Sequence, residues 1–366
     1  MPPRNHHHWL KQPKVEYISS ECYNNHAVYL AEQEMIFSKV WVPMCHKSEM
    51  SEPGNFRTTQ IAGKNVIAIN NGDTIQTYLN PGKFNTPAGS MTRVQFYMDD
   101  YVPLPTEVKH GGMIWTTLNT DIDMTVEQWT AGAFDCIADA IDTEELEVFH
   151  YHKAVIDTNY KLWHDTNSEF YHDFMHYFNR VSGFNDEYFA RKNIPFDNGH
   201  VNVSSFTVNY EEYDGFEDRG ELSFPNLPPN QWYMVDLFPG FNFNLRGSAY
   251  RSDTVTPLGP NKVLIEFRGY GLRNDTPEER QTRIKHHNSI WGPFGRNLHE
   301  DLIGVAGQGT TMREGTEARN ILHGRHENST IHDEVGMRHY YGAWGDFLGV
   351  NPARPLEHLP DVQAAE

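Results

Sequence analysis

Two histidines four residues apart occur in the segment NSEFYHDFMHYF, residues 167–178, with a glutamate three residues before the first. They are His172 and His176, and the glutamate is Glu169. On a helix, residues four apart share a face, so both imidazoles could reach one ion, and a carboxylate from elsewhere would complete the facial triad of a non-haem Fe(II) site. The spacing alone does not decide this, because about one such pair arises by chance among 20 histidines in 366 positions. Two ordinary histidines on a helix surface remain the alternative.

The composition narrows the classes of protein and partner. The chain has 366 residues, of which 38% are hydrophobic, and it has no apolar run of the roughly 20 residues that a membrane helix needs. A formal net charge of −19 repels phosphate backbones and anionic lipid, so we expect no nucleic acid and no membrane as a partner. Residues 1–15 contain no apolar signal region, which predicts a cytoplasmic protein. Only three widely spaced cysteines occur, which argues against a disulfide framework and against a cysteine-built zinc site: Cys22, Cys45 and Cys136.

The apolar pattern predicts an α+β protein in which a small β domain is set into a larger domain. Short strand-like runs bounded by turn residues fill the small domain, which we place at about 41–120, so that 1–40 and 121–366 form the larger one. Helical spacing is expected at 27–40 and 125–146, and a strand leading into a helix at 148–165, with the histidine pair on that helix. The remaining segments predict strands at 200–213, 232–247, 252–259 and 262–272 and helices at 277–295 and 333–349.

The residues before the histidines carry a family resemblance. The stretch NYKLWHDTNSEFYH resembles N-W-K-x-x-x-(D/E)-N-x-x-(D/E)-x-Y-H, which precedes the iron histidines in the catalytic α subunits of Rieske-type ring-hydroxylating oxygenases and their demethylating relatives. Six residues fall in register: Asn159, Lys161, Asp165, Glu169, Tyr171 and His172. Two differ, since Tyr160 and Thr166 replace the usual Trp and Asn, and His176 comes one residue earlier than the second iron histidine usually does. The resemblance implies that His172 and His176 bind Fe(II) and that Asp165 and Glu169 take part in catalysis.

A second segment extends the resemblance. GPFGRNLHEDLIGVAGQG, residues 292–309, is similar to the family segment in which a Gly-Pro-x-Gly turn is followed by an acidic pair and then by Gln and Gly. The second acid of that pair supplies the third iron ligand, which implies Asp301 here, although an acidic pair is more often a solvated helix face. The first strands and the last helix also resemble the family, so the likeness covers nearly the whole chain. It implies an antiparallel-sheet catalytic domain with helices, of the helix-grip kind.

The small domain departs from the family. A Rieske cluster needs two cysteines and two histidines from loops of the form C-x-H and C-x-x-H, and neither motif is present. Residues 81–87, from Pro81 to Pro87, occupy the place of the first loop, the second is expected to be deleted before VQFYMDD, and the adjacent Cys45 and His46 have the wrong spacing. We therefore expect a Rieske-like β domain without its own [2Fe–2S] cluster.

An iron site in a chain without its own cluster predicts that another protein supplies the electrons. The resemblance implies an Fe(II)-dependent mono- or dioxygenase subunit that acts on a small organic substrate and O2, and that receives electrons from a separate Rieske or ferredoxin-like protein and its reductase. In the family's trimers, electrons cross a subunit boundary through an acid three residues before the first histidine, and Glu169 occupies that place. A homotrimer or a mixed hexamer is expected.

Two other functions and the substrate stay open at this stage. The chain could be a non-catalytic scaffold subunit of a mixed oxygenase oligomer, or an iron enzyme doing non-redox chemistry, which would need no cluster. Aromatic acids, N-methyl compounds and small alkyl amines are all possible substrates. Arg246 could bind a substrate carboxylate or pair with an acid, and the aromatic residues nearby could line a pocket or belong to the core: Trp232, Phe238, Phe241 and Phe243.

Overall fold

The larger part of the protein is built on one antiparallel sheet. The computed structural model describes residues 17–80, 101–216, 219–315, 319–321 and 330–353. Seven strands pair in the order β10-β11-β12-β13-β14-β15-β9. Their bounds are β9 Leu146–Ile156, β10 Asn193–Pro195, β11 Val201–Thr207, β12 Gln231–Leu237, β13 Phe241–Arg246, β14 Ala249–Gly259 and β15 Lys262–Leu272. β14 and β15 continue for eleven residues each, and their side chains are largely buried.

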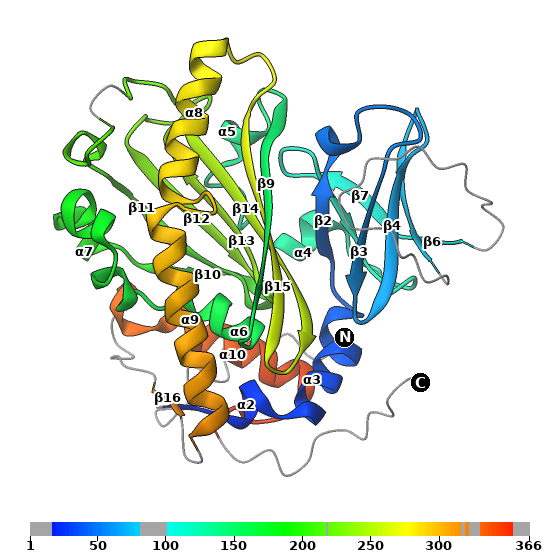
Figure 1. Ribbon diagram of the computed structural model, residues 1–366. Coiled ribbons are helices and arrows are strands. Elements are labelled where there is room, and N and C mark those ends of the chain that lie inside the picture. Colours follow the sequence, from blue (N-terminus) through cyan, green and yellow to red (C-terminus); the bar gives the residue numbers. More distant parts are fainter. Residues whose placement is uncertain (1–16, 81–100, 217–218, 316–318, 322–329, 354–366) are drawn as a thin grey trace.

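Helices cover one side and one end of this sheet. The two long helices, α8 (Pro277–Ile290) and α9 (Arg296–Glu314), run one after the other along its left side in Figure 1. Other helices gather at the lower end: α2 (Glu21–Asn24), α3 (His26–Glu32), α6 (Tyr160–Ser168) and α10 (Val335–Leu348). None of the helices in the described ranges is both long enough and apolar enough to cross a lipid bilayer.

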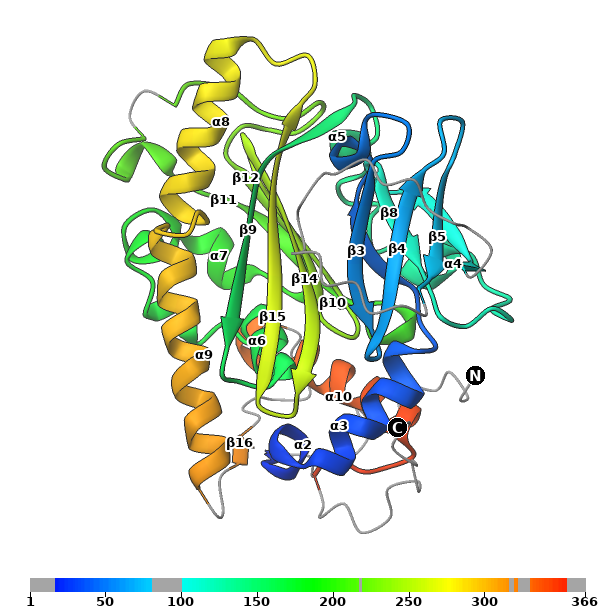
Figure 2. The same cartoon turned by 45° about the vertical axis from the view of Figure 1, so that its right-hand side comes forward.

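Strands β2 to β8 form two smaller sheets beside the large one (Figures 1 and 2), and β1 (Tyr17–Ser19) pairs with β16 (Arg319–Ile321). One has the order β2-β8-β7 and the other β3-β4-β5-β6. Their bounds are β2 Val42–His46, β3 Phe56–Ile61, β4 Lys64–Asn70, β5 Ile75–Leu79, β6 Val102–Leu104, β7 Thr106–Lys109 and β8 Met113–Thr116. The predicted α+β class is thus confirmed, with an antiparallel sheet flanked by helices and a separate set of β-strands. The segment 81–87 and the stretch VQFYMDD, where the two cluster loops were considered, lie outside the described residues.

Helix α6 is held by the polar residues of the family motif. Asn159 caps the helix by accepting the Lys161 backbone N–H, and its Nδ2 donates to the Tyr23 and Pro260 carbonyls. The ammonium of Lys161 is fully buried and pairs with Glu32 at 2.5 Å. A buried ion pair stabilises little by itself, but removal of one partner leaves a buried charge uncompensated. These contacts fix α6 against the N-terminal helices and so fix the segment that follows it.

Two sequence predictions of helix were wrong. Residues 125–146 form only the short helices α4 (Val126–Thr130) and α5 (Ala138–Ile141), because the chain turns at Ala131 and Gly132, which have positive φ angles of 52° and 82°. The histidine pair does not lie on the predicted helix either. Helix α6 ends at Ser168, Glu169 is extended with φ −113° and ψ 145°, and a short 3₁₀ turn follows at His172–Phe174.

Candidate metal and active site

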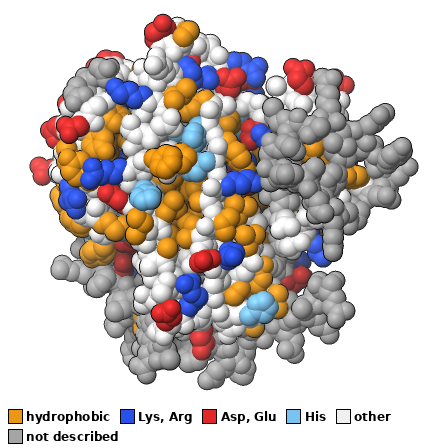
Figure 3. Space-filling model, in the orientation of Figure 1, with side chains coloured by type: hydrophobic (Ala, Val, Ile, Leu, Met, Phe, Trp, Pro, Cys, Tyr) orange, Lys and Arg blue, Asp and Glu red, His pale blue; other side chains and the backbone are white. Residues whose placement is uncertain are grey.

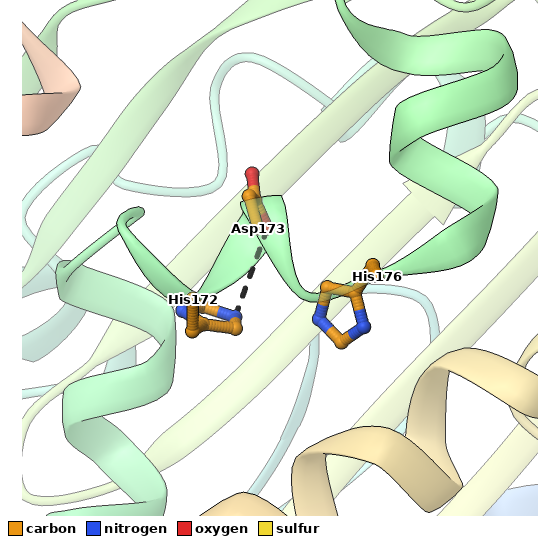
Figure 4. Close-up of side chains that lie close together, drawn as sticks. All are labelled: His172, Asp173 and His176. Atoms are coloured by element: carbon orange, nitrogen blue, oxygen red, sulfur yellow. Dashed lines mark ion pairs between the residues drawn. The ribbon is translucent and has the colours of Figure 1, made fainter.

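The segment after α6 is shaped by the side chain of Glu169. Its Oε2 accepts the backbone N–H groups of Tyr171 at 2.9 Å and His172 at 3.3 Å. A carboxylate that accepts backbone donors two and three residues ahead competes with helix continuation and starts a new turn. The new turn brings His172, Asp173 and His176 close together, as Figure 4 shows.

The same glutamate orients the first imidazole. Nδ1 of His172 lies 2.5 Å from Oε1 of Glu169 and donates its hydrogen to it. Because Nδ1 is used in this way, Nε2 is the ring nitrogen left to bind a metal ion. Nε2 of His172 lies 3.6 Å from Oδ1 of Asp301.

The second imidazole is held by a matching arrangement from helix α9. Nδ1 of His176 donates to Oε2 of Glu300 at 2.8 Å, and Nε2 lies 2.9 Å from Oδ1 of Asp301. Glu300 and Asp301, which are neighbours on α9, therefore contact different ring nitrogens of His176. A carboxylate on the far nitrogen of each histidine is the usual support of metal-binding imidazoles, since it fixes the tautomer and increases basicity. In the sequence, Glu300 is visible only as half of an acidic pair, and this contact was not predicted.

The donor set fits a divalent metal ion. Nε2 of His172, Nε2 of His176 and Oδ1 of Asp301 come from two separate segments and converge on one point, and donors that share an ion at about 2.1 Å lie roughly 3 to 3.5 Å apart. Oδ1 of Asp301 is buried without a well-aligned hydrogen bond. Two imidazoles and one carboxylate are the donor set of non-haem Fe(II) oxygenases.

A second carboxylate competes for the role of third ligand. Oδ1 of Asp173 lies 3.7 Å from Nε2 of His172 (Figure 4). Its other oxygen already accepts from the Tyr188 hydroxyl at 2.9 Å and lies 3.5 Å from the Arg191 guanidinium. Asp173 lies within 4.8 Å of donor atoms of both histidines. Asp301, however, lies within 4 Å of both Nε2 atoms, whereas Asp173 comes that close to His172 only and is tied to Tyr188 and Arg191, so Asp301 is the better candidate.

The charges around the imidazoles favour a cation. Burial lowers the pKa of His172, but the carboxylates of Glu169, Asp173 and Asp301 outweigh burial and raise it to about 10. For His176, burial is likewise outweighed, chiefly by Asp301, and the pKa is raised. The imidazoles in turn lower the pKa of Asp301 against the opposing effect of burial. Positive charge at this point is therefore strongly stabilised, whether protons or a metal ion supply it.

A small cavity of about 40 Å³ adjoins the three donors. Its wall is one face of the sheet, where cross-strand neighbours such as Trp232 and Arg246 project together. Aromatic and sulfur-containing side chains make most of the apolar lining: Trp163, Phe170, Trp232, Met234 and Trp291. A volume of this size has room for about three water-sized groups, which suits a substrate of few heavy atoms. Of the aromatic residues singled out from the sequence, Phe241 and Phe243 are fully buried in the core, and Phe238 is also core.

Asp165 is not brought to the histidines. It is buried on α6, where it accepts hydrogen bonds from the hydroxyls of Tyr23 and Tyr341, and it does not line the cavity. Burial raises its pKa to about 7. The three cysteines are also separate from the site, with Cys22 on α2, Cys45 on β2 and Cys136 near α5, and all three are free thiols.

Fold and site together define the class of protein. The family profile described as "Ring hydroxylating alpha subunit (catalytic domain)" matches residues 143–349. The chain belongs to this family, the α subunits of Rieske non-haem iron oxygenases, whose catalytic site uses non-haem iron and which work with separate electron-transfer partners. It is therefore an oxidoreductase of the mono- and dioxygenase class.

Two relatives and two solved structures are similar to this chain over most of its length. The chain is 53% identical to the methanesulfonate monooxygenase hydroxylase α subunit of Methylosulfonomonas methylovora, over all of both chains. It is 31% identical to the 2-aminobenzenesulfonate 2,3-dioxygenase α subunit of Alcaligenes sp, over 90% of this chain and 93% of the relative. Among solved structures, a quaternary ammonium Rieske monooxygenase superposes with a TM-score of 0.72 at 15% identity, covering 92% of this chain and 97% of the other. Naphthalene 1,2-dioxygenase from Rhodococcus sp gives 0.71 at 17% identity, covering 90% and 94%.

Proposed function

We propose that this chain oxygenates a small organosulfonate at an Fe(II) ion held by His172, His176 and Asp301. The observation that carries the proposal is the convergence of both imidazole Nε2 atoms on one carboxylate oxygen, at 2.9 and 3.6 Å. An Fe(II) ion held by these three groups keeps open positions and supplies the activation of O2. Glu169 and Glu300 then have equivalent tasks, each fixing the tautomer and direction of one ring.

The substrate class is supported by the relatives and by the cavity. Two relatives are named for sulfonates, one a methanesulfonate monooxygenase and the other a 2-aminobenzenesulfonate dioxygenase. The cavity of about 40 Å³ favours the smaller, alkyl kind. In such a monooxygenation, one oxygen atom of O2 enters a C–H bond beside sulfur, and the other is reduced to water by two electrons and two protons from outside. The hydroxymethanesulfonate formed from methanesulfonate then breaks its C–S bond and gives formaldehyde and bisulfite.

We propose further that those electrons come from a separate protein. The sequence has no C-x-H or C-x-x-H motif to hold a Rieske cluster. The alignment with the 53% identical relative is 415 positions long, whereas this chain has 366 residues, so the difference of 49 positions lies opposite gaps in this chain. A deletion of this size agrees with the loss of cluster loops from a small β domain at 41–120.

The surface beside Glu169 supports a docking face for such a donor. Tyr171, Phe174 and Met175 are 44%, 46% and 41% exposed, and they lie on the same turn as His172. Exposed apolar side chains grouped in this way are typical of protein contact sites. From this face, Glu169 offers a direct hydrogen-bonded connection to the His172 ring.

Assembly into a trimer or mixed hexamer is also part of the proposal. Strand β9 is the last strand in the order of the large sheet, and Val155 on it is 60% exposed. Figure 3 shows hydrophobic side chains gathered on this face, between the long helices and the smaller sheets. An apolar face over a sheet edge is a common subunit contact.

Reconstitution tests the proposed function. The iron-loaded protein is mixed with a Rieske-type donor, its reductase, NAD(P)H and methanesulfonate, and the consumption of O2 and the release of sulfite are followed. We expect both to depend on methanesulfonate and on the donor. Product formed in many turnovers without any reductant would reject the oxygenase proposal in favour of non-redox chemistry. Activity that appears only when a complete α subunit is added, and that survives His172→Ala in this chain, would favour a scaffold role.

A further inference from the structure

One buried arginine in the cavity wall has no acidic partner. Arg246 is the last residue of β13, and it is 8% exposed. Its Nε is buried without a hydrogen-bond partner, and no described residue forms an ion pair with its guanidinium. A buried charge is costly unless it is paired, so an arginine left in this state points to a ligand that completes it.

The two other arginines near this wall are neutralised. Arg191 lies 3.5 Å from the carboxylate of Asp173, and Arg251 donates to Asp253 at 2.8 Å. Both pairs are buried. All three guanidinium groups are buried, so burial does not distinguish Arg246 from the other two. Among the described residues, Arg246 alone of the three forms no ion pair with a carboxylate.

Aromatic rings fix the position of the Arg246 guanidinium without cancelling its charge. Its central carbon lies 5.5 Å from the ring of Phe178, 5.6 Å from Trp232 and 5.2 Å from Trp291. Rings attract a cation through their faces but carry no net charge. Burial is the main cause that lowers the pKa of Arg246, and Arg251 lowers it further, whereas Tyr210 and the more distant carboxylates of Asp173 and Asp301 act in the opposite direction. Arginine nevertheless stays protonated in proteins, so the site holds a positive charge.

We infer that Arg246 binds the anionic group of the substrate and so directs the remainder of the molecule toward His172, His176 and Asp301. The inference rests on the proposed function and names the residue that recognises the sulfonate. Arg246 and the three metal-binding candidates line the same cavity. A planar guanidinium presents parallel N–H donors that match two oxygens of an oxyanion. Nε of Arg251 is likewise buried without a partner and supplies a further donor at the same wall.

Ligand binding to three variants tests the inference. Methanesulfonate and dimethyl sulfone, a neutral molecule of similar shape, are titrated by calorimetry into iron-loaded protein under anaerobic conditions. For Arg246→Gln we expect methanesulfonate to bind about 100-fold more weakly, since a buried charge partner is lost, while sulfone binding and iron content stay unchanged. Arg246→Lys keeps the charge and should recover part of the loss. Arg273→Gln is the control, because it removes the same charge from a side chain that is 51% exposed. It should change the affinity for neither ligand.

Each outcome distinguishes the inference from the proposed function. If Arg246→Gln binds methanesulfonate as tightly as the wild-type protein does, the inference is wrong and the proposed function stands. If the wild-type protein binds acetate but not methanesulfonate, the sulfonate assignment fails, and the inference survives only if acetate binding needs Arg246. If both Arg246 variants lost affinity for methanesulfonate and for dimethyl sulfone equally, Arg246 would have a structural role, and the inference would be overturned.

Discussion

Glu169 and Glu300 form a matched pair for testing the electron route. Each accepts the Nδ1–H of one imidazole, at 2.5 and 2.8 Å. Glutamine keeps the size of the side chain and one acceptor oxygen, so Glu169→Gln and Glu300→Gln should each retain the ring orientation and bind iron. The two glutamates differ in two respects: Glu169 also accepts the backbone N–H groups of Tyr171 and His172, and only Glu169 directly precedes the turn with the exposed apolar residues proposed to receive the donor.

The expected magnitudes follow from these differences. A change in a group that supports a metal ligand typically costs 10- to 100-fold in affinity or activity. We expect Glu300→Gln to lose only about 10-fold in multiple-turnover rate, the lower end of this range. Glu169→Gln should lose about 100-fold, or about 2.7 kcal/mol in the activation free energy of electron delivery, because the charged hydrogen-bonded bridge is gone.

Two assays on the same preparations separate orientation from electron delivery. A single turnover of iron-loaded protein with hydrogen peroxide in place of O2 needs no donor, because peroxide already carries the two electrons, so both variants should match the wild-type rate within about threefold. Steady-state turnover with donor, reductase and NAD(P)H should be slow in Glu169→Gln only. An equal steady-state loss in Glu300→Gln would mean that Glu169 merely orients its imidazole, and full steady-state activity in Glu169→Gln would refute the route.

Three further predictions concern the cofactor, the assembly and pH. The purified protein should contain no acid-labile sulfide and should lack the visible absorption of a Rieske cluster, and either signal would contradict the proposed loss of cluster ligands. Light scattering should report a trimer or hexamer, and a monomer at micromolar concentration would count against the proposed interface. Burial raises the pKa of Asp165 to about 7, against roughly 3.9 in an unfolded chain. The folded state therefore binds the extra proton between about pH 4 and 7, and this group's contribution to stability falls as the pH rises through that window. Urea unfolding of iron-free Asp165→Asn at pH 5 and 8 should show a smaller difference than the wild-type protein does, and an unchanged difference would refute the assignment.

The sequence predicted the fold where local pattern and long-range structure agree. The alternating apolar strands and the capped helix at 277–295 have such patterns, and α8 begins with the Thr276 and Glu279 capping box. The helix expected at 125–146 failed because apolar spacing does not report the positive φ angles at Ala131 and Gly132.

The site was predictable in its residue types but not in its geometry. The family motif gave His172, His176 and Asp301, yet the spacing of four suggested a helix, and the side chain of Glu169 ends that helix by accepting backbone donors. The role of Glu300 as a partner of His176 spans 124 positions, and no local pattern encodes it.

For Asp165 and Arg246, the sequence did not reveal which residues each side chain contacts. Asp165 is in register with a motif that otherwise carries chemistry, but its hydrogen bonds go to Tyr23 and Tyr341 and not to the histidines. Arg246 was left unassigned from sequence because 49 acidic residues offer many partners. Only the packing of the sheet face reveals that no described acid pairs with it.

The identity of the third ligand tests the iron site most directly. Asp301→Asn and Asp173→Asn remove one carboxylate each with the same change in size, from the two acids that face His172. Iron is measured per chain in protein prepared without oxygen. Our account predicts about one iron per chain in the wild-type protein and in Asp173→Asn, and a sharp loss in Asp301→Asn. Iron that stays in Asp301→Asn and is lost from Asp173→Asn, or an unchanged content in both, would contradict it.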